Sequence, residues 1–277
     1  MNELNPNPNP NLFPRRRVIS LIAGAAGAAL LAACSDGIDN SAPSPTAANG
    51  ATTSLDPGAT TAAVVGGGDC AVDIPQETAG PFPGDGSNGP DALTDPAAVR
   101  EDITGSFGAY TGTAEGVPTT MHLTVLDGAN GCTPLRGAAV YAWHADRDGR
   151  YSMYTAQEAN YLRGVGETDE AGTVTFRTVF PGCYDGRWPH VHFEVYPSLA
   201  DAQSASNLIV TSQLALPQDA CEAAYAADGY ASSATALTHT SLERDMVFRD
   251  GAAQQLAAVT GSVADGFEVS LAFTVHP

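Results

Sequence analysis

The segment FEVSLAFTV, residues 267–275, decides the fold class, because apolar and polar residues alternate along its whole length. Successive side chains of a β-strand point to opposite faces, so this pattern predicts a strand with one buried face. Five further segments have the length and the apolar content of strands, and they are residues 121–127, 138–144, 173–179, 190–196 and 208–214.

Helical signal is confined to residues 219–227 and 253–258. Short strands joined by turn-rich connections such as Asp127-Gly128 and Pro181-Gly182 are typical of β-sandwiches. The sequence therefore predicts an all-β dominated fold, with a β-sandwich core of two sheets, long loops and a few short helices.

The first 33 residues have the pattern of an export signal. Three arginines, Arg15–Arg17, precede an apolar run that ends in small residues before Cys34. That run is shorter than the roughly 20 residues that a membrane-spanning helix needs. The pattern predicts a twin-arginine-like signal peptide over residues 1–33, and Cys34 resembles the lipidated cysteine of bacterial lipoproteins. We expect an exported protein, either a cell-envelope lipoprotein or secreted; an ordinary signal peptide with a chance cysteine is the alternative.

Residues 34–68 are rich in Ser, Ala, Thr and Gly, and they are predicted to form a flexible linker. Residues 69–277 are then expected to form one domain of ordinary size. The formal net charge of −19 argues against nucleic acid and against anionic lipid as partners. Membrane contact is expected only through a lipid on Cys34, and composition does not determine the oligomeric state.

Four cysteines remain after Cys34, and they are Cys70, Cys132, Cys183 and Cys221. An even number in an exported domain predicts two disulfides, although four cysteines allow three pairings. Our expectation is Cys70–Cys132 with Cys183–Cys221. A cysteine metal site is less expected, because the sequence has no C-x-x-C spacing.

His190 and His192 fall on one face of a predicted strand, and Val191 falls on the other. Two imidazoles on one face can share a metal ion, while a pair of structural histidines is the simpler alternative. A zinc hydrolase would need a third ligand and an activated water, and no H-E-x-x-H pattern is present. Glu194 shares the face, but its spacing is shorter than in cupin metal sites. His144 is expected to be a buried core histidine.

Several short motifs surround this pair in a fixed order. They comprise Trp143, Ala145, Gly149 and Tyr151; Thr168, Asp169 and Gly172; Pro181 and Tyr184; and Arg187, His190, His192 and Phe193. The segments 78–82 and 211–213 flank them. This ordered set, over about 70–215, resembles the intradiol ring-cleavage dioxygenases, the family of catechol, hydroxyquinol and protocatechuate dioxygenases.

The resemblance implies an Fe(III) site with two tyrosinate and two imidazole ligands, which are Tyr151, Tyr184, His190 and His192. Hard phenolate oxygens favour Fe(III), whereas Fe(II) oxygenases use two histidines and a carboxylate. The resemblance also implies that Tyr184 leaves the metal and takes a proton from the substrate. Tyr154 and Tyr161 are nearby alternatives to Tyr151.

The implied activity is the cleavage of catechol-type rings with O2 to muconate-type products, outside the cytoplasm. Arg187 is expected to stabilise anionic charge on the substrate, Gln213 to orient the oxygen, and Pro81 to contact the substrate. A structural salt bridge for Arg187 and a sheet-edge hydrogen bond for Gln213 are the alternatives. A competing hypothesis is a non-catalytic β-sandwich lipoprotein that binds a sugar or a protein partner. The long helical segment that precedes the core in dimeric relatives is missing, which leaves oligomer and substrate open.

Overall fold

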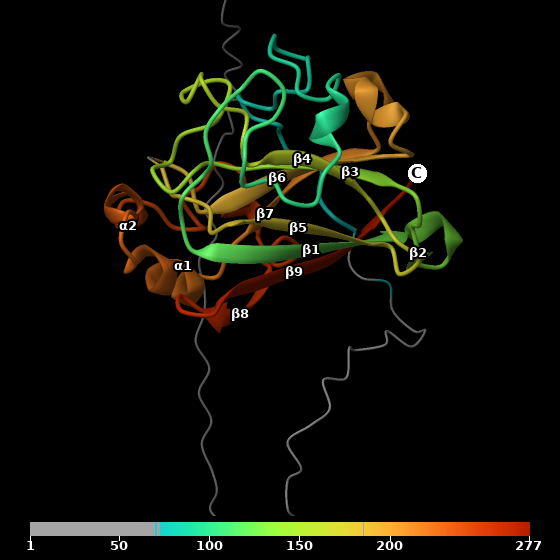
Figure 1. Ribbon diagram of the computed structural model, residues 1–277. Helices are drawn as coiled ribbons and strands as arrows, with labels where there is room; N and C mark the ends of the chain where they lie inside the picture. Colours follow the sequence, from blue (N-terminus) through green and yellow to red (C-terminus); the bar gives the residue numbers. More distant parts are fainter. Residues whose placement is uncertain (1–69, 71–72, 185) are drawn as a thin grey trace, which may run out of the picture. The chain divides into compact units, whose positions relative to one another are not determined.

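In a computed structural model, residues 70, 73–184 and 186–277 are described, and they form mainly β-strands in two sheets (Figure 1). This architecture confirms the predicted sandwich. The predicted signal peptide over 1–33, Cys34 and the whole of the predicted linker over 34–68 lie outside the described residues. Within the described ranges, no helix combines the length and the apolar character needed to cross a membrane.

The first sheet is organised around β1 (Pro118–Asp127). It pairs in parallel with β9 (Gly266–Val275), although the two strands lie at opposite ends of the domain sequence. The sheet is completed by β2 (Thr133–Pro134), β5 (Thr173–Val179) and β8 (Ala258–Ser262). Strand β9 contains the segment 267–275, and its burial alternates as predicted from residue 267 to residue 273.

The second sheet is antiparallel, in the order β4-β3-β6-β7. Its strands are β3 (Ala139–Trp143), β4 (Arg163–Glu167), β6 (His190–Tyr196) and β7 (Val210–Ala215). Every residue of β6 is buried. Both faces of this strand are therefore covered, one by the other sheet and the other by loops.

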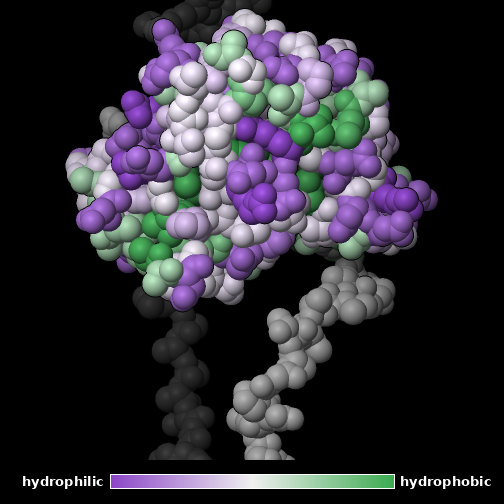
Figure 2. Space-filling view, viewed as in Figure 1, coloured by the Kyte–Doolittle hydropathy of each residue, from purple (hydrophilic) through white to green (hydrophobic). Residues whose placement is uncertain are grey.

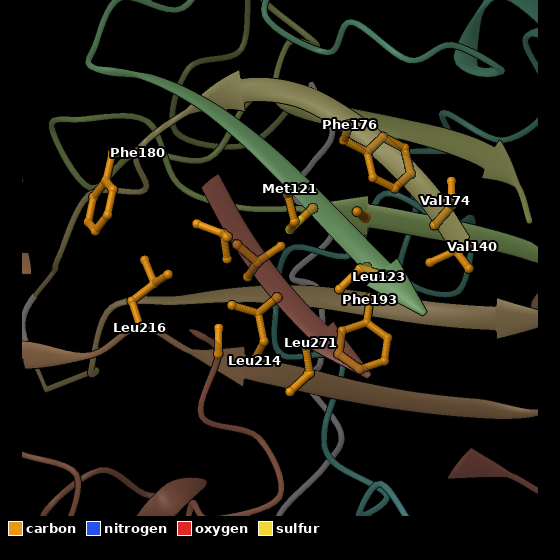
Figure 3. Close-up of a cluster of buried hydrophobic side chains, with 14 of the residues drawn as sticks. Met121, Leu123, Val140, Val174, Phe176, Phe180, Phe193, Leu214, Leu216 and Leu271 are labelled. Carbon is orange, nitrogen blue, oxygen red and sulfur yellow. The ribbon is translucent and has the colours of Figure 1, made fainter. Parts of the chain in front are cut away.

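The hydrophobic core lies between the two sheets, and Figure 3 shows its central side chains. Phe193 of β6 packs against Phe273 of β9 with ring centroids 4.8 Å apart. Met121, Leu123 and Leu271 belong to the same cluster. Because the odd-numbered residues of β6 point into this core, its even-numbered residues point to the opposite face of the sheet. That face carries His190 and His192.

Two helices follow β7 in the described chain, α1 (Gln218–Tyr225) and α2 (Ala231–Leu237). The helix predicted over 253–258 is wrong. The backbone there pairs with the end of β7, since Ala215 N donates to Gln255 O and Ala257 N donates to Ala215 O. Residues 253–255 form a single turn, and from Leu256 the chain runs parallel to the end of β7 until β8 begins.

The described residues also contain five short 3-10 turns. They are η1 (Pro96–Ala98), η2 (Gly128–Asn130), η3 (Asp201–Gln203), η4 (Ala205–Asn207) and η5 (Phe248–Asp250).

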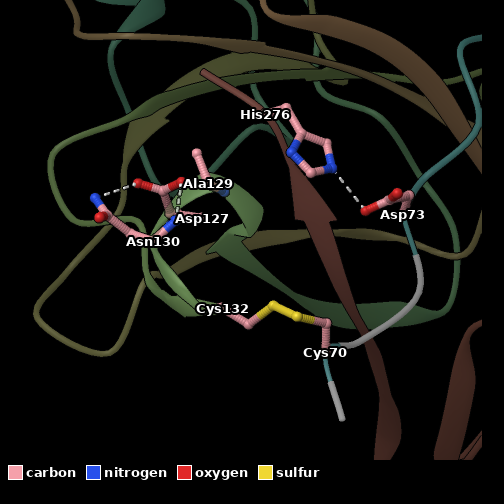
Figure 4. Close-up of a disulfide and its surroundings, with 7 residues drawn as sticks. All are labelled: Cys70, Asp73, Asp127, Ala129, Asn130, Cys132 and His276. Carbon is pink, nitrogen blue, oxygen red and sulfur yellow. Dashed lines mark hydrogen bonds and ion pairs between the residues drawn. A yellow bond between two sulfur atoms is a disulfide. The ribbon is translucent and has the colours of Figure 1, made fainter.

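The Cys70–Cys132 disulfide is confirmed (Figure 4). It links the N-terminal end of the domain to the turn after η2 across 62 residues of sequence. A disulfide that closes a loop of this length stabilises the folded domain by about 4 kcal/mol. Nearby, His276 Nε2 lies 2.9 Å from Asp73 Oδ1, and Asp127 accepts hydrogen bonds from the backbone of η2. Together these contacts fasten the first described residues to β1 and β9.

The predicted Cys183–Cys221 disulfide is wrong in this structure, where Cys221 carries a thiol. A disulfide brings the two sulfurs to about 2.0 Å. Here each sulfur faces a backbone carbonyl instead, with Cys183 Sγ 3.4 Å from Arg187 O and Cys221 Sγ 3.9 Å from Leu216 O. Burial, and then the neighbouring Cys183, raise the pKa of Cys221 well above its usual value, so this thiol stays protonated.

The face of the domain seen in Figure 2 is mostly hydrophilic, with hydrophobic residues in small separate patches. Among the described residues, the large hydrophobic side chains that are exposed are scattered in sequence, and they are Val99, Tyr110, Met246, Leu256 and Val263. Single exposed apolar residues are ordinary on a soluble surface.

Candidate active site

Strand β6 places two imidazoles side by side on the face away from the core. His190 Nε2 lies 3.0 Å from His192 Nε2, and both side chains are almost fully buried. The ring of Trp143, on the adjacent strand β3, stacks on His192 with centroids 4.9 Å apart and planes 5° from parallel. The alternation read from the sequence thus brings the two histidines together, and β3 fixes the plane of one ring.

Two tyrosines reach the same point from different loops. Tyr151 lies in the connection between β3 and β4, and Tyr184 lies in the connection between β5 and β6. Their hydroxyl oxygens are 3.3 Å apart, and each lies 3.3 Å from His190 Nε2. We call Tyr151, Tyr184, His190 and His192 the four-donor cluster.

The alternative tyrosines point elsewhere. Tyr154 Oη donates to Asn88 Oδ1 at 2.7 Å and accepts from Gly84 N at 2.9 Å. Tyr161 Oη donates to Asp146 Oδ2 at 2.9 Å. The structure therefore brings Tyr151 to the histidines and not its two neighbours; the assignment of Tyr151 as a metal ligand stays a prediction.

A glycine brings the two tyrosine loops into contact. Gly149 has a φ of +80°, and a Cβ on it would lie 2.8 Å from Cys183 O and 2.9 Å from Tyr184 Cβ. Glycine satisfies both the left-handed backbone and the close approach. Two residues later, Tyr151 N donates to Thr155 Oγ1 at 2.8 Å, which closes the turn that carries the Tyr151 ring.

The two histidines are neutral at physiological pH. Burial, followed by the charge of Arg187, lowers the pKa of His190 to about 3. Burial and the neighbouring His190 lower the pKa of His192 well below its usual value. His190 Nδ1 donates to Trp188 O at 2.5 Å, so its Nε2 keeps a lone pair. Neutral imidazoles with an accessible lone pair are the form that binds metals.

Burial also acts on the two phenols. It raises the pKa of Tyr151 well above 10, with a further contribution from Tyr184, and it raises the pKa of Tyr184. Both side chains are therefore neutral in the metal-free protein, and a bound cation would favour their ionised forms.

The donor set fits a metal ion. Two phenol oxygens and two imidazole nitrogens lie together in a buried space, joined by four contacts of 3.0–3.3 Å. Among the described residues, His192 Nδ1 has no hydrogen-bond partner. In the same part of the chain, no group of three or more His, Cys, Asp or Glu side chains is placed to hold a metal. Half of the donors in the cluster are phenols, and a set of two phenolates and two imidazoles suits Fe(III).

Arg187 and Gln213 lie beside the cluster and bind each other. Arg187 Nη1 lies 3.4 Å from His190 Nε2, and Arg187 Nη2 donates to Gln213 Oε1 at 2.6 Å. Gln213 Nε2 donates to Thr78 O at 2.8 Å. Both ends of the Gln213 amide are thus engaged, one with Arg187 and the other with Thr78, and its direct role with oxygen stays a prediction. Arg187 also forms the salt bridge weighed as its alternative role, to Asp245.

The loop that contains Pro81 covers the cluster. Gly80 has a φ of +71°, and a Cβ on it would lie 3.4 Å from His192 Cε1. Phe82 packs 5.2 Å from the Tyr151 ring, measured between centroids. Pro81 lies between these two residues and is exposed. Its predicted contact with the substrate stays a prediction, and its position at the rim agrees with it.

Arg163 is a site residue for which the sequence reasoning gave no role. It is 1% exposed, and it donates to Pro83 O at 2.7 Å, Phe82 O at 2.9 Å and Ser152 O at 2.9 Å. It therefore ties the loop above the cluster to the turn that carries Tyr151. Its position in the N-Y-L-R-G stretch, residues 160–164, was the available signal.

Asp245 was missed as well, because a lone acidic residue in a loop carries no sequence signal. Its carboxylate lies 2.9 Å from Arg187 Nε, and it is fully buried. Burial alone would raise the pKa of Asp245, but hydrogen bonds from Trp188 N and the charge of Arg187 outweigh it and lower that pKa. Asp245 is therefore ionised at neutral pH.

Two other polar residues near the cluster are satisfied locally. His144 Nε2 lies 2.7 Å from Thr178 Oγ1 and its Nδ1 lies 2.8 Å from Ala145 O, which agrees with a core histidine. Glu194 accepts a hydrogen bond from Tyr196 Oη at 2.7 Å, and burial raises its pKa to about 7. Neither side chain joins the four-donor cluster.

Comparisons with known proteins agree with this geometry. The sequence model described as dioxygenase matches residues 89–227, which is half of the chain. Among curated proteins, none matches the sequence.

Solved structures with the same fold include an intradiol ring-cleavage dioxygenase from Tetranychus urticae. The chain is 26% identical to it, with a TM-score of 0.53, over 65% of this chain and 87% of that one. A second crystallised dioxygenase has 23% identity and a TM-score of 0.60, over 76% of this chain and 96% of that one. The second likeness shows the fold alone.

Proposed function

Because this chain belongs to the intradiol ring-cleavage dioxygenases, a family of oxidoreductases, we propose that it is an Fe(III) enzyme that opens catechol-type rings with O2 outside the cytoplasm. The observation that carries this proposal is the four-donor cluster, in which two phenols and two neutral imidazoles meet in a buried space. Muconate-type acids are the proposed products.

Tyr151, Tyr184, His190 and His192 would hold the iron. Ferric iron bound there would supply a Lewis-acidic centre that binds a catecholate and makes its ring reactive toward O2. Neutral histidines need no deprotonation, whereas both phenols must release a proton when the metal binds. The protein keeps this site dry, since the two histidines and Tyr151 are each at most 3% exposed.

Tyr184 is the residue proposed to accept a substrate proton at its Oη. Its ring is only partly buried, whereas Tyr151 is 2% exposed and packs under Phe82. Arg187 lies beside Tyr184 and opposes the effect of burial on its pKa. Tyr184 is the more exposed phenol and lies next to a fixed positive charge. It is therefore the better placed of the two tyrosines to leave the iron and act as a base.

The surroundings of the cluster fit a flat aromatic diol. Phe82 lies 5.2 Å from Tyr151, and Phe248 lies 6.4 Å from His190, both between ring centroids. Two aromatic side chains thus flank the donors, and an aromatic ring gains from contact with them. Arg187 adds N–H groups that can bind an anionic oxygen of the substrate.

The disulfide supports the location outside the cytoplasm. Bridges such as Cys70–Cys132 persist in oxidising compartments and are rare in the cytosol. A signal peptide over 1–33 and lipidation of Cys34 are part of the proposal. Replacing Cys34 with serine should release the exported domain from the membrane fraction, and unchanged membrane retention would rule out the lipid anchor.

The test of the activity is an oxygen-uptake assay with iron-loaded protein and catechol under ¹⁸O2. We expect one O2 consumed per ring, and both labelled atoms in a ring-opened dicarboxylic acid detected by mass spectrometry. Tyr110→Phe serves as a control for the tyrosine variants, because Tyr110 is exposed and lies before β1, in a different connection from both tyrosines of the cluster. An iron-loaded protein that leaves catechol and its hydroxylated or chlorinated derivatives intact would refute the proposal.

A further inference from the structure

Asp245 lies outside the segment matched by the family model, in the loop between α2 and η5. Its carboxylate accepts hydrogen bonds on both oxygens. Oδ2 accepts from Arg187 Nε at 2.9 Å and from Trp188 N at 2.6 Å. Oδ1 accepts from Val247 N at 2.8 Å and from Phe248 N at 3.3 Å. Three backbone N–H groups therefore hold the carboxylate in place independently of the guanidinium.

Arg187 is held at two of its edges. Nε binds Asp245, and Nη2 donates to Gln213 Oε1 at 2.6 Å, while Gln213 is itself fixed to Thr78 O. A guanidinium is planar and rigid, so two anchors determine its orientation. The remaining nitrogen, Nη1, then faces the cluster at 3.4 Å from His190 Nε2.

The same carboxylate reaches His190 by a second route. Trp188 N donates to Asp245 Oδ2, and Trp188 O accepts from His190 Nδ1 at 2.5 Å. Asp245 thus holds the backbone of Trp188, whose carbonyl orients one imidazole, as well as the guanidinium. It also balances the charge of Arg187, since the pair is buried and carries one charge of each sign.

We propose that Asp245 is a positioning residue, which holds Arg187 so that Nη1 presents its N–H groups to an anionic oxygen of the bound catechol. This inference rests on the proposed function and adds to it a residue that acts through Arg187. The contacts of Nη1 with substrate strengthen only where negative charge develops, so its orientation affects both binding and turnover.

Asp245→Asn is the variant that tests it. An amide keeps the size of the side chain but puts an NH2 group either toward Arg187 Nε and Trp188 N or toward Val247 N and Phe248 N. Either the anchor of the guanidinium or the backbone contacts that hold the side chain are then lost, and the negative charge beside Arg187 is lost in both cases. Misplacing such a group by about 1 Å costs roughly 10²-fold in rate. We expect kcat to fall by about that factor, the anaerobic Kd for catechol to rise, and the iron content to stay at the wild-type level.

Glu170→Gln is the matched control. It also removes one carboxylate from an arginine pair, but Glu170 and its partner Arg136 are both exposed. We expect this variant to keep the wild-type kcat and Kd. Unchanged kcat and Kd in Asp245→Asn would overturn the proposal.

A double-variant cycle separates positioning from general stability. If Asp245 acts on the substrate mainly through Arg187, then most of the effect of Asp245→Asn on kcat/KM and on catechol Kd disappears once Arg187→Gln is present, and the remainder measures the contact through Trp188. Additive losses would overturn the proposal. Should Asp245→Asn fail to fold, the comparison of Arg187→Gln with the double variant, which lacks both charges, still decides the question. Wild-type protein that binds but does not cleave catechol would refute the proposed function alone, because the Kd comparison would still test Asp245.

Discussion

Replacing Gly149 with alanine tests whether the site depends on contact between the two tyrosine loops. The added Cβ would lie 2.8 Å from Cys183 O, whereas ordinary contact begins at 3.4 Å. The loops of Tyr151 and Tyr184 would therefore have to separate by about 0.6 Å, which is the difference between these two distances.

Two costs follow, and a second glycine separates them. Alanine at a φ of +80° costs about 1–2 kcal/mol of folding free energy. Gly131 has a φ of +66°, and a Cβ added to it would meet nothing within 4 Å, so Gly131→Ala carries the backbone cost without the clash. Displacement of the ligand loops by a sizeable fraction of 1 Å should add a loss of roughly 10-fold to 10²-fold in turnover, for Gly149→Ala only.

The assay pairs urea unfolding with catechol cleavage by iron-loaded protein. Gly131→Ala should lose about 1–2 kcal/mol of unfolding free energy, and Gly149→Ala should lose more because of its clash. Gly149→Ala alone should lose activity and bind iron more weakly. If the two variants show the same activity and the same iron affinity, then contact between the loops does not shape the site.

Three further predictions concern the tyrosines, a core histidine and the disulfide. Tyr184→Phe should keep iron and a shifted visible band but lose roughly 10²–10⁴ in turnover, with partial recovery at higher pH. Tyr151→Phe should instead bind iron poorly. Wild-type turnover by Tyr184→Phe at neutral pH would contradict the proposed role of Tyr184 as the base. Burial lowers the pKa of His144 to about 4, so its contribution to stability is complete above about pH 6.5 and is lost as the pH falls toward 4. Between pH 7 and pH 5, the unfolding free energy of His144→Gln measured in urea should therefore fall by about 2 kcal/mol less than that of wild type. Equal losses of unfolding free energy would refute the buried neutral state. Cys70→Ser should lower the unfolding free energy by about 2–5 kcal/mol without changing the visible spectrum, and an unchanged midpoint in urea would show that the bridge does not stabilise the domain.

The fold and the histidine pair were predictable because local periodicity determines them. Strand β6 has the predicted bounds, 190–196, and its alternation alone places His190 and His192 on one face. The motif order then predicted which tyrosines would join them. The contacts of the alternatives, Tyr154 and Tyr161, depend on loop paths that no local pattern reports.

The remaining features depend on long-range contacts. The segment 253–258 has helix-forming residues, but hydrogen bonds with Ala215 determine its conformation. The pairing of Cys183 with Cys221 was expected from an even count, and a count carries no geometry. Asp245 reaches Arg187 across 58 residues of sequence. A side chain without a motif cannot be assigned to a site until the fold brings it there.

The most direct test of the central claim is the iron content and the visible spectrum of the purified protein. With two tyrosinate ligands, it should hold about one ferric ion per chain and show a broad tyrosinate-to-iron absorption band that shifts when catechol is added without oxygen. The band should persist in Tyr154→Phe and be lost or strongly altered in Tyr151→Phe. Tightly bound zinc alone, with a colourless protein after iron reconstitution, or loss of the band in Tyr154→Phe and not in Tyr151→Phe, would contradict the account.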